Sequence, residues 1–180
     1  GKRRKSPAAP FITSTLQQEA SRKLNFTAKR TMAAAQTLYE GVEVSDKGPV
    51  GLITYMRTDS LRISEEALKS AREYILEKWG EKYLPDSPRK FKTKASAQDG
   101  HEAIRPTNPS ISPDQIKESL SSDQYKIYKL VWERFIASQM SNCIQNTTQV
   151  DIYAKKENSE HKYVFKASAY DIAFDGFMIL

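Results

Sequence analysis

Apolar residues recur at helical spacing through the middle of the chain, and serine, threonine or glycine stands at the borders of these segments. Such borders are typical of helix caps, so each segment is predicted to be a helix. The predicted helices cover residues 16–24, 27–40, 65–79 and 123–142, and a further one starts at Ser112-Pro113. The second helix has a predicted apolar face made of Met32, Ala35, Leu38 and Tyr39.

Near the end of the chain, apolar and polar residues alternate, which indicates β-strands. Residues 150–154 and 163–169 alternate in this way around a polar turn at 157–162, and they predict a β-hairpin. A short β-branched and aromatic run at 52–56 predicts one more strand. The first ten residues are predicted to be a linker that enters an extended segment, and loops are predicted at 42–51 and 81–100.

A mainly helical middle flanked by extended segments predicts an α+β fold, of the kind that a helical insertion in a β-rich domain produces. The 180 residues fit one domain, or one domain plus part of another. With 39% hydrophobic and 10% aromatic residues, the chain can form a core. Its net charge of +6 suggests an anionic partner, although a basic tail such as residues 2–5 is more often a solvated linker than a binding arm.

The chain has one cysteine, Cys143, which excludes an intrachain disulfide and a cysteine-based zinc cluster. We expect Cys143 to be a small buried residue at the end of a helix. No apolar run approaches the ~20 residues of a membrane helix, and no apolar stretch of a signal peptide follows the basic start. The expected location is therefore the cytoplasm.

Tyr55 and Arg57 form the first candidate site, because alternate residues of a strand lie on the same face. A phenol is ordinarily a poor nucleophile, and a nearby guanidinium favours its phenolate and can bind phosphate oxygens in a fork. The pair therefore suits phosphoryl transfer to a tyrosine. Such pairs are also common at the rim of ordinary sheets, and the residues alone favour that simpler interpretation.

His101 and Arg105 form the second candidate site, because one helical turn places residues four apart on the same face. A histidine and an arginine on one turn suit a phosphate, whereas a structural histidine is the alternative. A metal site is not expected here, because the spacing of metal ligands is missing. The third candidate is Thr13, Ser14 and Thr15 with Gln17 and Gln18, where a helix start can bind phosphate, although composition alone favours plain caps.

Three strings stand out together: Pro10–Gln18 (PFITSTLQQ), Gly51–Ser60 (GLITYMRTDS) and His101–Thr107 (HEAIRPT). In this order and spacing they resemble the bacterial type IA DNA topoisomerases. Met56 is more typical of topoisomerase I than of its topoisomerase III and reverse gyrase relatives. The resemblance covers nearly the whole chain from Pro10 onward.

The resemblance implies a role for each matching residue. Tyr55 would be the nucleophile that takes the 5′-phosphate of a cut single strand, and Arg57 would bind and stabilise that phosphate. His101 would contact the phosphate, with Arg105 and Asp59 in support. Further residues near the DNA strand would be Thr13, Ser14 and Gln18.

The resemblance also implies a domain organisation. Residues 1–18 would be a linker and a segment of the family's arch domain, 19–140 the helical catalytic-tyrosine domain, and 141–180 the returning β-rich arch segment. The family's toprim domain binds Mg²⁺ through an Asp-x-Asp pair and a glutamate, but this chain has no Asp-x-Asp. We therefore expect Mg²⁺ only in the full-length enzyme, with none bound by this chain.

These features predict a fragment that is inactive alone, with Tyr55 partly exposed. Its partners would be single-stranded DNA and the toprim and remaining domains of the same polypeptide, not a membrane, and the chain would be a monomer at the nucleoid. A non-catalytic module that binds single-stranded DNA is the alternative. A protein-interaction fragment would show no salt-dependent DNA affinity. A tyrosine recombinase does not fit, because its tyrosine follows the histidine.

Overall fold

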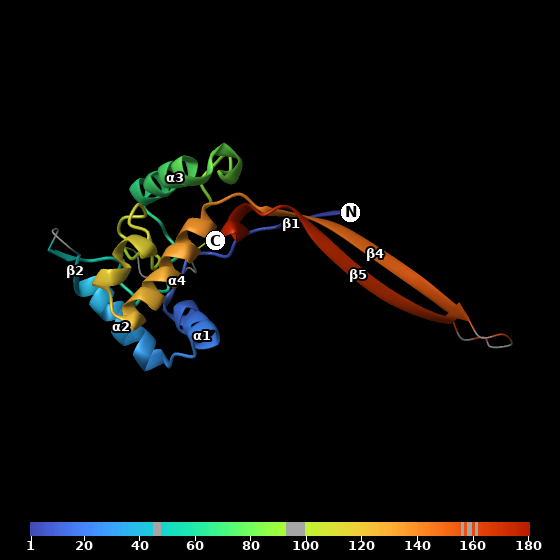
Figure 1. Cartoon of the computed structure of the whole chain (residues 1–180), viewed down its shortest axis with the longest axis horizontal. Coiled ribbons are helices and arrows are strands. Elements are labelled where there is room, and N and C mark those ends of the chain that lie inside the picture. The colour runs from blue at the N-terminus through green and yellow to red at the C-terminus, as the bar shows by residue number, and fades with distance from the viewer. Residues whose placement is uncertain (45–47, 93–99, 156, 158–159, 161) are drawn as a thin grey trace.

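The computed structural model describes residues 1–44, 48–92, 100–155, 157, 160 and 162–180. A compact helical body lies at one end, and a long β-hairpin projects from it as an arm (Figure 1). The N-terminal segment runs beside the base of this arm. The mixed helical and β content confirms the predicted α+β class.

The body is built from α1 (Thr13–Leu24), α2 (Ala28–Glu40), α3 (Glu65–Trp79) and α4 (Ser122–Ser138). Shorter 3-10 helices are η2 (Glu81–Tyr83), η3 (Pro113–Ser119) and η4 (Gly176–Ile179). The side chains of Thr27 and Ser64 cap α2 and α3, each accepting a hydrogen bond from a backbone N–H of the first turn at 3.2 Å.

Three helix borders differ from the prediction. Helix α1 begins at Thr13, three residues early, because the Thr13 hydroxyl bonds the segment at residues 56–58 and does not cap the helix. Helix α4 is capped by Ser121 and ends at Ser138, where the chain turns into a strand. The segment after Ser112 is a 3-10 helix.

Helix α4 lies at the centre of the core, in contact with α1 and α2. Its residues Tyr128, Val131, Phe135 and Ile136 are fully buried. The Tyr128 hydroxyl donates to the Ile111 carbonyl at 2.6 Å, so the polar tip of this buried ring is paired. Burial raises the pKa of Tyr128 well above its usual range, which keeps the phenol neutral.

The arm consists of β4 (Cys143–Lys155) and β5 (Lys162–Phe174), paired antiparallel, as the alternation predicted. Strand β1 (Lys2–Lys5) pairs with the first residues of β4. The basic start of the chain is exposed, as predicted, but it is an edge strand and not a linker. Cys143 is buried as predicted, but it starts β4 and does not end a helix.

Two β predictions in the body need correction. The predicted loop at 42–51 contains a small sheet of β2 (Val42–Glu43) and β3 (Pro49–Val50). The predicted strand at 52–56 is reduced to one isolated bridge between Ile53 and Pro106. Part of the hairpin turn, at 156, 158–159 and 161, lies outside the described residues.

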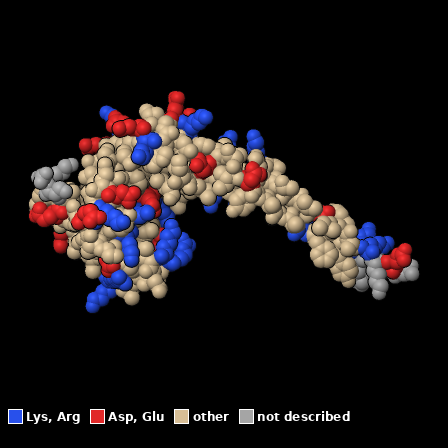
Figure 2. Space-filling view, in the orientation of Figure 1, with Lys and Arg blue, Asp and Glu red and all other residues tan. Residues whose placement is uncertain are grey.

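One face of the arm is apolar in its outer part, at residues 150–154 and 163–167. The cross-strand pairs on this face are Val150–Ala167, Ile152–Phe165 and Ala154–Tyr163. Ile152 is 54% exposed and Phe165 is 59% exposed, so nothing in the described part of the chain covers this face. Uncharged residues make up most of the arm's surface in Figure 2. Among the described residues, no helix is long and apolar enough to span a bilayer.

Candidate active site

Three segments that are far apart in the sequence meet at one end of α1. Phe11 forms an isolated bridge with Ile104, whose N–H donates to the Phe11 carbonyl at 2.8 Å. The N–H of Thr13 donates to the Thr58 carbonyl at 3.0 Å. Together with the Ile53–Pro106 bridge, these bonds join residues 11–13, 52–60 and 101–107 into one framework.

The segment from Tyr55 to Ser60 alternates strictly between exposed and buried residues. Tyr55, Arg57 and Asp59 are exposed, whereas the residues between them are buried. The predicted shared face of Tyr55 and Arg57 is therefore present, although the backbone forms no continuous strand. Bonds of side chains to neighbouring backbone take the place of a ladder, and buried Met56 anchors the segment in the core.

The Tyr55 ring is 40% exposed, as expected. It contacts the His101 ring, with 5.9 Å between the ring centroids, and the Tyr39 ring, with 5.4 Å. Its neighbour Thr54 donates a hydrogen bond to the Ala103 carbonyl at 2.7 Å, which holds the tyrosine segment beside the histidine segment. Within the described residues, the Tyr55 hydroxyl has no hydrogen-bond partner, so it is open to a reactant.

A hollow of about 360 Å³ lies beside this face. Its lining comes from Ile12, Thr13 and Ser14 at the start of α1, from Arg57, Thr58 and Asp59, and from His101. Five residues named from the sequence therefore line one hollow. Arg57 makes no ion pair within the described residues, so its guanidinium is available to an anion. The hollow combines a cation, an imidazole and hydroxyls, which suits a phosphate group.

Thr13 holds the hollow together. Its hydroxyl lies 2.7 Å from the Met56 carbonyl oxygen as donor and accepts the Thr58 N–H at 2.9 Å. These bonds fix the backbone on both sides of Arg57. Ser14 is exposed at the rim, and Gln18 is exposed one turn further along α1, outside the lining of the hollow.

The predicted helical turn from His101 to Arg105 is wrong. Residues 103–107 are extended, because their backbone is paired with Phe11 and with residues 52–54. The Arg105 guanidinium points into the protein, with 2.7 Å to the Glu102 carboxylate and 12% exposure of its side chain. Arg105 therefore does not line the hollow.

Two residues that the sequence reasoning missed set the position of His101. Arg62 donates from Nε to the His101 carbonyl at 3.3 Å, and Glu102 accepts the Ser64 N–H at 2.6 Å. Both tie the histidine loop to the start of α3. Neither role has a local signal in the sequence, because each partner lies 38 or 39 residues away.

The hollow does not fit a magnesium site. Asp59 is the one carboxylate in its lining, and divalent magnesium prefers several oxygen ligands. Within the described ranges, no group of three or more histidine, cysteine, aspartate or glutamate side chains is placed to hold a metal ion.

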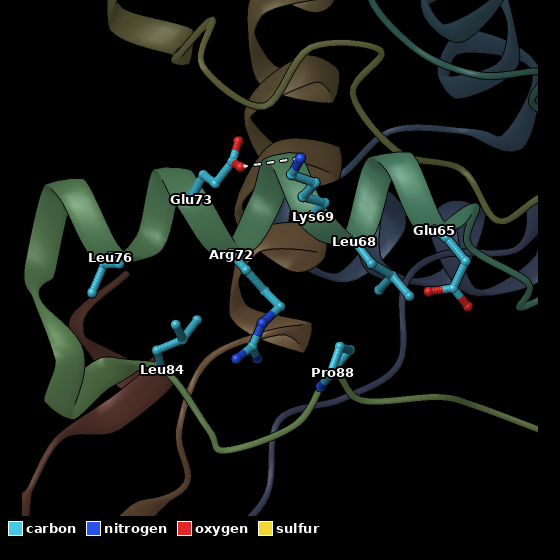
Figure 3. A pocket seen from close by; sticks show the side chains of 8 residues that line it. All are labelled: Glu65, Leu68, Lys69, Arg72, Glu73, Leu76, Leu84 and Pro88. Carbon is cyan, nitrogen blue, oxygen red and sulfur yellow. Dashed lines mark ion pairs between the residues drawn. The ribbon is translucent and has the colours of Figure 1, made fainter.

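A second hollow, of about 350 Å³, lies on α3 and contains none of the residues singled out from the sequence. Leu68, Leu76, Leu84 and Pro88 supply its apolar lining (Figure 3). Arg72 crosses it and donates to the Pro85 carbonyl at 2.9 Å. The guanidinium thus bridges α3 and the loop after η2, which is a structural role.

Comparison with known proteins points to a single family. A family model described as DNA topoisomerase matches residues 1–180 of the chain. DNA topoisomerase 1 of Rickettsia felis is 51% identical over 175 residues, covering 97% of this chain and 22% of that protein. Full-length topoisomerase I from Thermotoga maritima, in a monoclinic crystal form, superposes with a TM-score of 0.82 at 41% identity. That match covers 99% of this chain and 28% of the solved one. The chain thus spans about a quarter of the length of these relatives.

Proposed function

Because the chain belongs to the bacterial type IA DNA topoisomerase family, we propose that it carries the nucleophile with which such an enzyme cuts one DNA strand. The longer polypeptide would relax negative supercoils by transient cleavage, strand passage and religation. The observation that supports this proposal is the exposed Tyr55 beside a hollow lined by Arg57 and His101.

The proposed step is a transfer of the phosphodiester to Tyr55. The phenolic oxygen attacks the phosphorus and loses its proton, a phosphotyrosine bond forms, and the bond to the 3′-oxygen breaks. The 3′-oxygen leaves as a hydroxyl after taking up a proton, and the DNA 5′-phosphate stays on the protein. Religation is the reverse transfer, so the energy of the phosphodiester is kept.

Each side chain of the hollow has a proposed part in this step. Arg57 binds the non-bridging oxygens of the phosphate and stabilises the charge that develops there. His101, next to the Tyr55 ring, donates a hydrogen bond to the same group. Ser14 and Gln18 would contact the DNA strand along α1, while Thr13 positions the Arg57 backbone. Asp59 and Arg105 would act in support, Arg105 through Glu102 and the histidine loop.

The remaining domains of the polypeptide would complete the site. In this proposal Mg²⁺ is held by the toprim domain and supplies charge neutralisation at the phosphate, while this chain supplies the nucleophile and the arginine. The division into arch segments at 1–18 and 141–180 and a tyrosine domain at 19–140 remains part of the proposal. The apolar face of the arm supports it, because such a face is normally covered in a folded protein.

The test is formation of a covalent adduct. A single-stranded oligonucleotide labelled at its 3′ end is incubated with the chain and Mg²⁺, with and without a separately expressed toprim region. We expect label on the protein after a denaturing gel only when the toprim region is present. The Tyr55→Phe variant should form none while keeping its fold, because only one hydroxyl is lost.

Tyr163→Phe is the matched control, since this tyrosine is also exposed but lies on the arm. It should form the adduct normally. An adduct that persists in Tyr55→Phe would refute the assignment of the nucleophile. Salt-dependent DNA binding without any adduct, even in a single polypeptide that includes the toprim region, would favour a non-catalytic DNA-binding module.

A further inference from the structure

A second exposed tyrosine lies directly beside Tyr55. Tyr39, on the last turn of α2, is 41% exposed, and its ring meets the Tyr55 ring edge to face at an interplanar angle of 63°. The sequence predicted Tyr39 on the apolar face of α2. Ala35 and Leu38 of that face are buried as predicted, together with Thr31 and Ala34, but Tyr39 is not, so the core does not require a tyrosine at position 39.

The backbone fixes this pair of rings. The Leu52 N–H donates to the Leu38 carbonyl at 2.7 Å, so the chain that leads to Tyr55 passes against the end of α2. A Cβ atom on Gly51 would lie 2.8 Å from the Tyr39 carbonyl oxygen, which is too close for any other residue without movement of the backbone. The approach therefore depends on glycine, and the two tyrosines are held together by main-chain contacts.

The two rings that contact Tyr55, those of His101 and Tyr39, lie in chemically different surroundings. His101 lines the polar hollow together with Arg57, where a phosphate fits. Tyr39 does not line that hollow, and it offers an exposed aromatic ring with no hydrogen bond to its hydroxyl among the described residues. A nucleotide carries a phosphate and an aromatic base a few ångströms apart. The two environments match these two parts.

We propose that Tyr39 forms a nucleobase subsite, in which its ring stacks on the base next to the phosphate that Tyr55 attacks. The inference rests on the proposed cleavage function and adds a base contact to it. Aromatic stacking accepts every base, because each has a π face, and it discriminates only by stacking strength. The subsite would therefore hold the strand in register without reading a defined sequence.

The experiment measures how the full chain binds short single-stranded oligonucleotides that carry a 5′-phosphate, with adenine or an abasic site at the first position. The first nucleotide of such an oligonucleotide corresponds to the one joined to Tyr55 after cleavage. In the wild type, loss of the base should weaken binding roughly 5- to 100-fold, the usual contribution of one stacked base. Tyr39→Phe should keep this difference, and Tyr39→Leu should lose most of it.

Tyr170→Leu is the matched control, because this tyrosine is 65% exposed on the arm. It should respond to the abasic site as the wild type does, and thermal melting checks that each variant is folded. Tyr39→Leu that still senses the missing base would overturn the subsite while leaving the cleavage function intact. A wild-type chain that binds the adenine and abasic oligonucleotides equally, or binds neither, would also overturn the subsite, whereas the cleavage function is decided separately by the adduct test.

Discussion

At the scale of single residues, the site depends on one short segment that buries every second side chain. Met56 and Thr58 are held inside, so Tyr55, Arg57 and Asp59 must face outward. This arrangement gives an unpaired guanidinium next to an unpaired phenol within the described part of the chain. It can receive a phosphate without breaking any existing interaction of these two side chains.

Arg57→Lys is expected to slow adduct formation about 10- to 100-fold although the positive charge remains, because an ammonium lacks the planar fork that binds two oxygens. The rate is measured by single-turnover cleavage in a polypeptide that includes the toprim region. Arg72→Lys on α3 serves as control, since this arginine bonds the Pro85 carbonyl and does not line the site hollow. Cleavage at the wild-type rate in Arg57→Lys would exclude a bidentate contact.

Thr13→Val is expected to lower the free energy of unfolding by about 1–3 kcal/mol, because the Met56 carbonyl and the Thr58 N–H lose a partly buried partner. Valine has nearly the same shape, so packing changes little. Urea unfolding measures the loss, and Thr13→Ser should recover most of it. A valine variant as stable as the wild type would show that these bonds do not hold the loop.

At the scale of elements, the sequence predicted those parts whose signals are local. The borders predicted for α2 and α3 depend on residues next to these helices, and the structure has them within one residue. The segment at 52–60 and the histidine loop were predicted with the wrong local structure. The hydrogen bonds that join these segments run to partners at least 38 residues away, which no local pattern reports.

The sequence predicted which residues form the candidate site, but not the contacts that hold them in place. Tyr55, Arg57, Asp59 and His101 were found because their motifs carry them, and the structure brings them together. The positions of these residues also depend on Arg62 and Glu102, which hold the histidine loop, and on the contact of Tyr39 with Tyr55. These contacts arise because segments distant in the sequence cross. A single sequence contains no periodicity or spacing that encodes such a crossing.

Helices α1 and α4 are joined by a carboxylate that is surrounded by cations. Glu19 lies 3.1 Å from Lys23 and 3.6 Å from Arg134, and it also pairs with Arg22. Burial alone would raise the pKa of Glu19, but its hydrogen bond from Lys23 and the charges of Arg134 and Arg22 outweigh burial and lower it. The folded state therefore favours the ionised carboxylate.

A lowered folded-state pKa means that this stabilisation is present above the ordinary value of 4.5 and is lost as the pH falls through the folded-state pKa. Glu19→Gln should cost about 1–3 kcal/mol at pH 7 and much less near pH 3. Urea unfolding at both pH values measures this. Burial raises the pKa of the nearby Glu133, so the pH dependence of its contribution has the opposite sign. Glu133 is present in both the wild type and Glu19→Gln, so its contribution cancels in the comparison.

Glu77→Gln, an exposed position on α3, is the control and should behave like the wild type at both pH values. An equal loss for Glu19→Gln at pH 3 and pH 7 would mean that packing, and not charge, accounts for the effect.

At the scale of the whole molecule, the body and the arm differ in where their apolar residues lie. The body buries its apolar residues around α4, whereas the arm presents Ile152 and Phe165 openly on one face. A two-stranded hairpin is only marginally stable by itself, so we expect another part of the protein to pack against this face. Because the chain spans about a quarter of its relatives' length, the remaining polypeptide is the proposed cover.

Changing the pair Ile152 and Phe165 to threonine should therefore act differently in two settings. In the chain alone, the double variant should self-associate less by light scattering, with the melting of the helical body unchanged, because an exposed apolar face drives association. In the longer polypeptide, it should lower the unfolding free energy by roughly 3–6 kcal/mol, since each side chain contributes about 1.5–3 kcal/mol when buried.

Gln149→Thr with Ser168→Thr, a cross-strand pair on the opposite face, is the matched control and should change little in either setting. Equal effects of both double variants in the longer polypeptide would mean that the apolar face is not the one that the other domains cover.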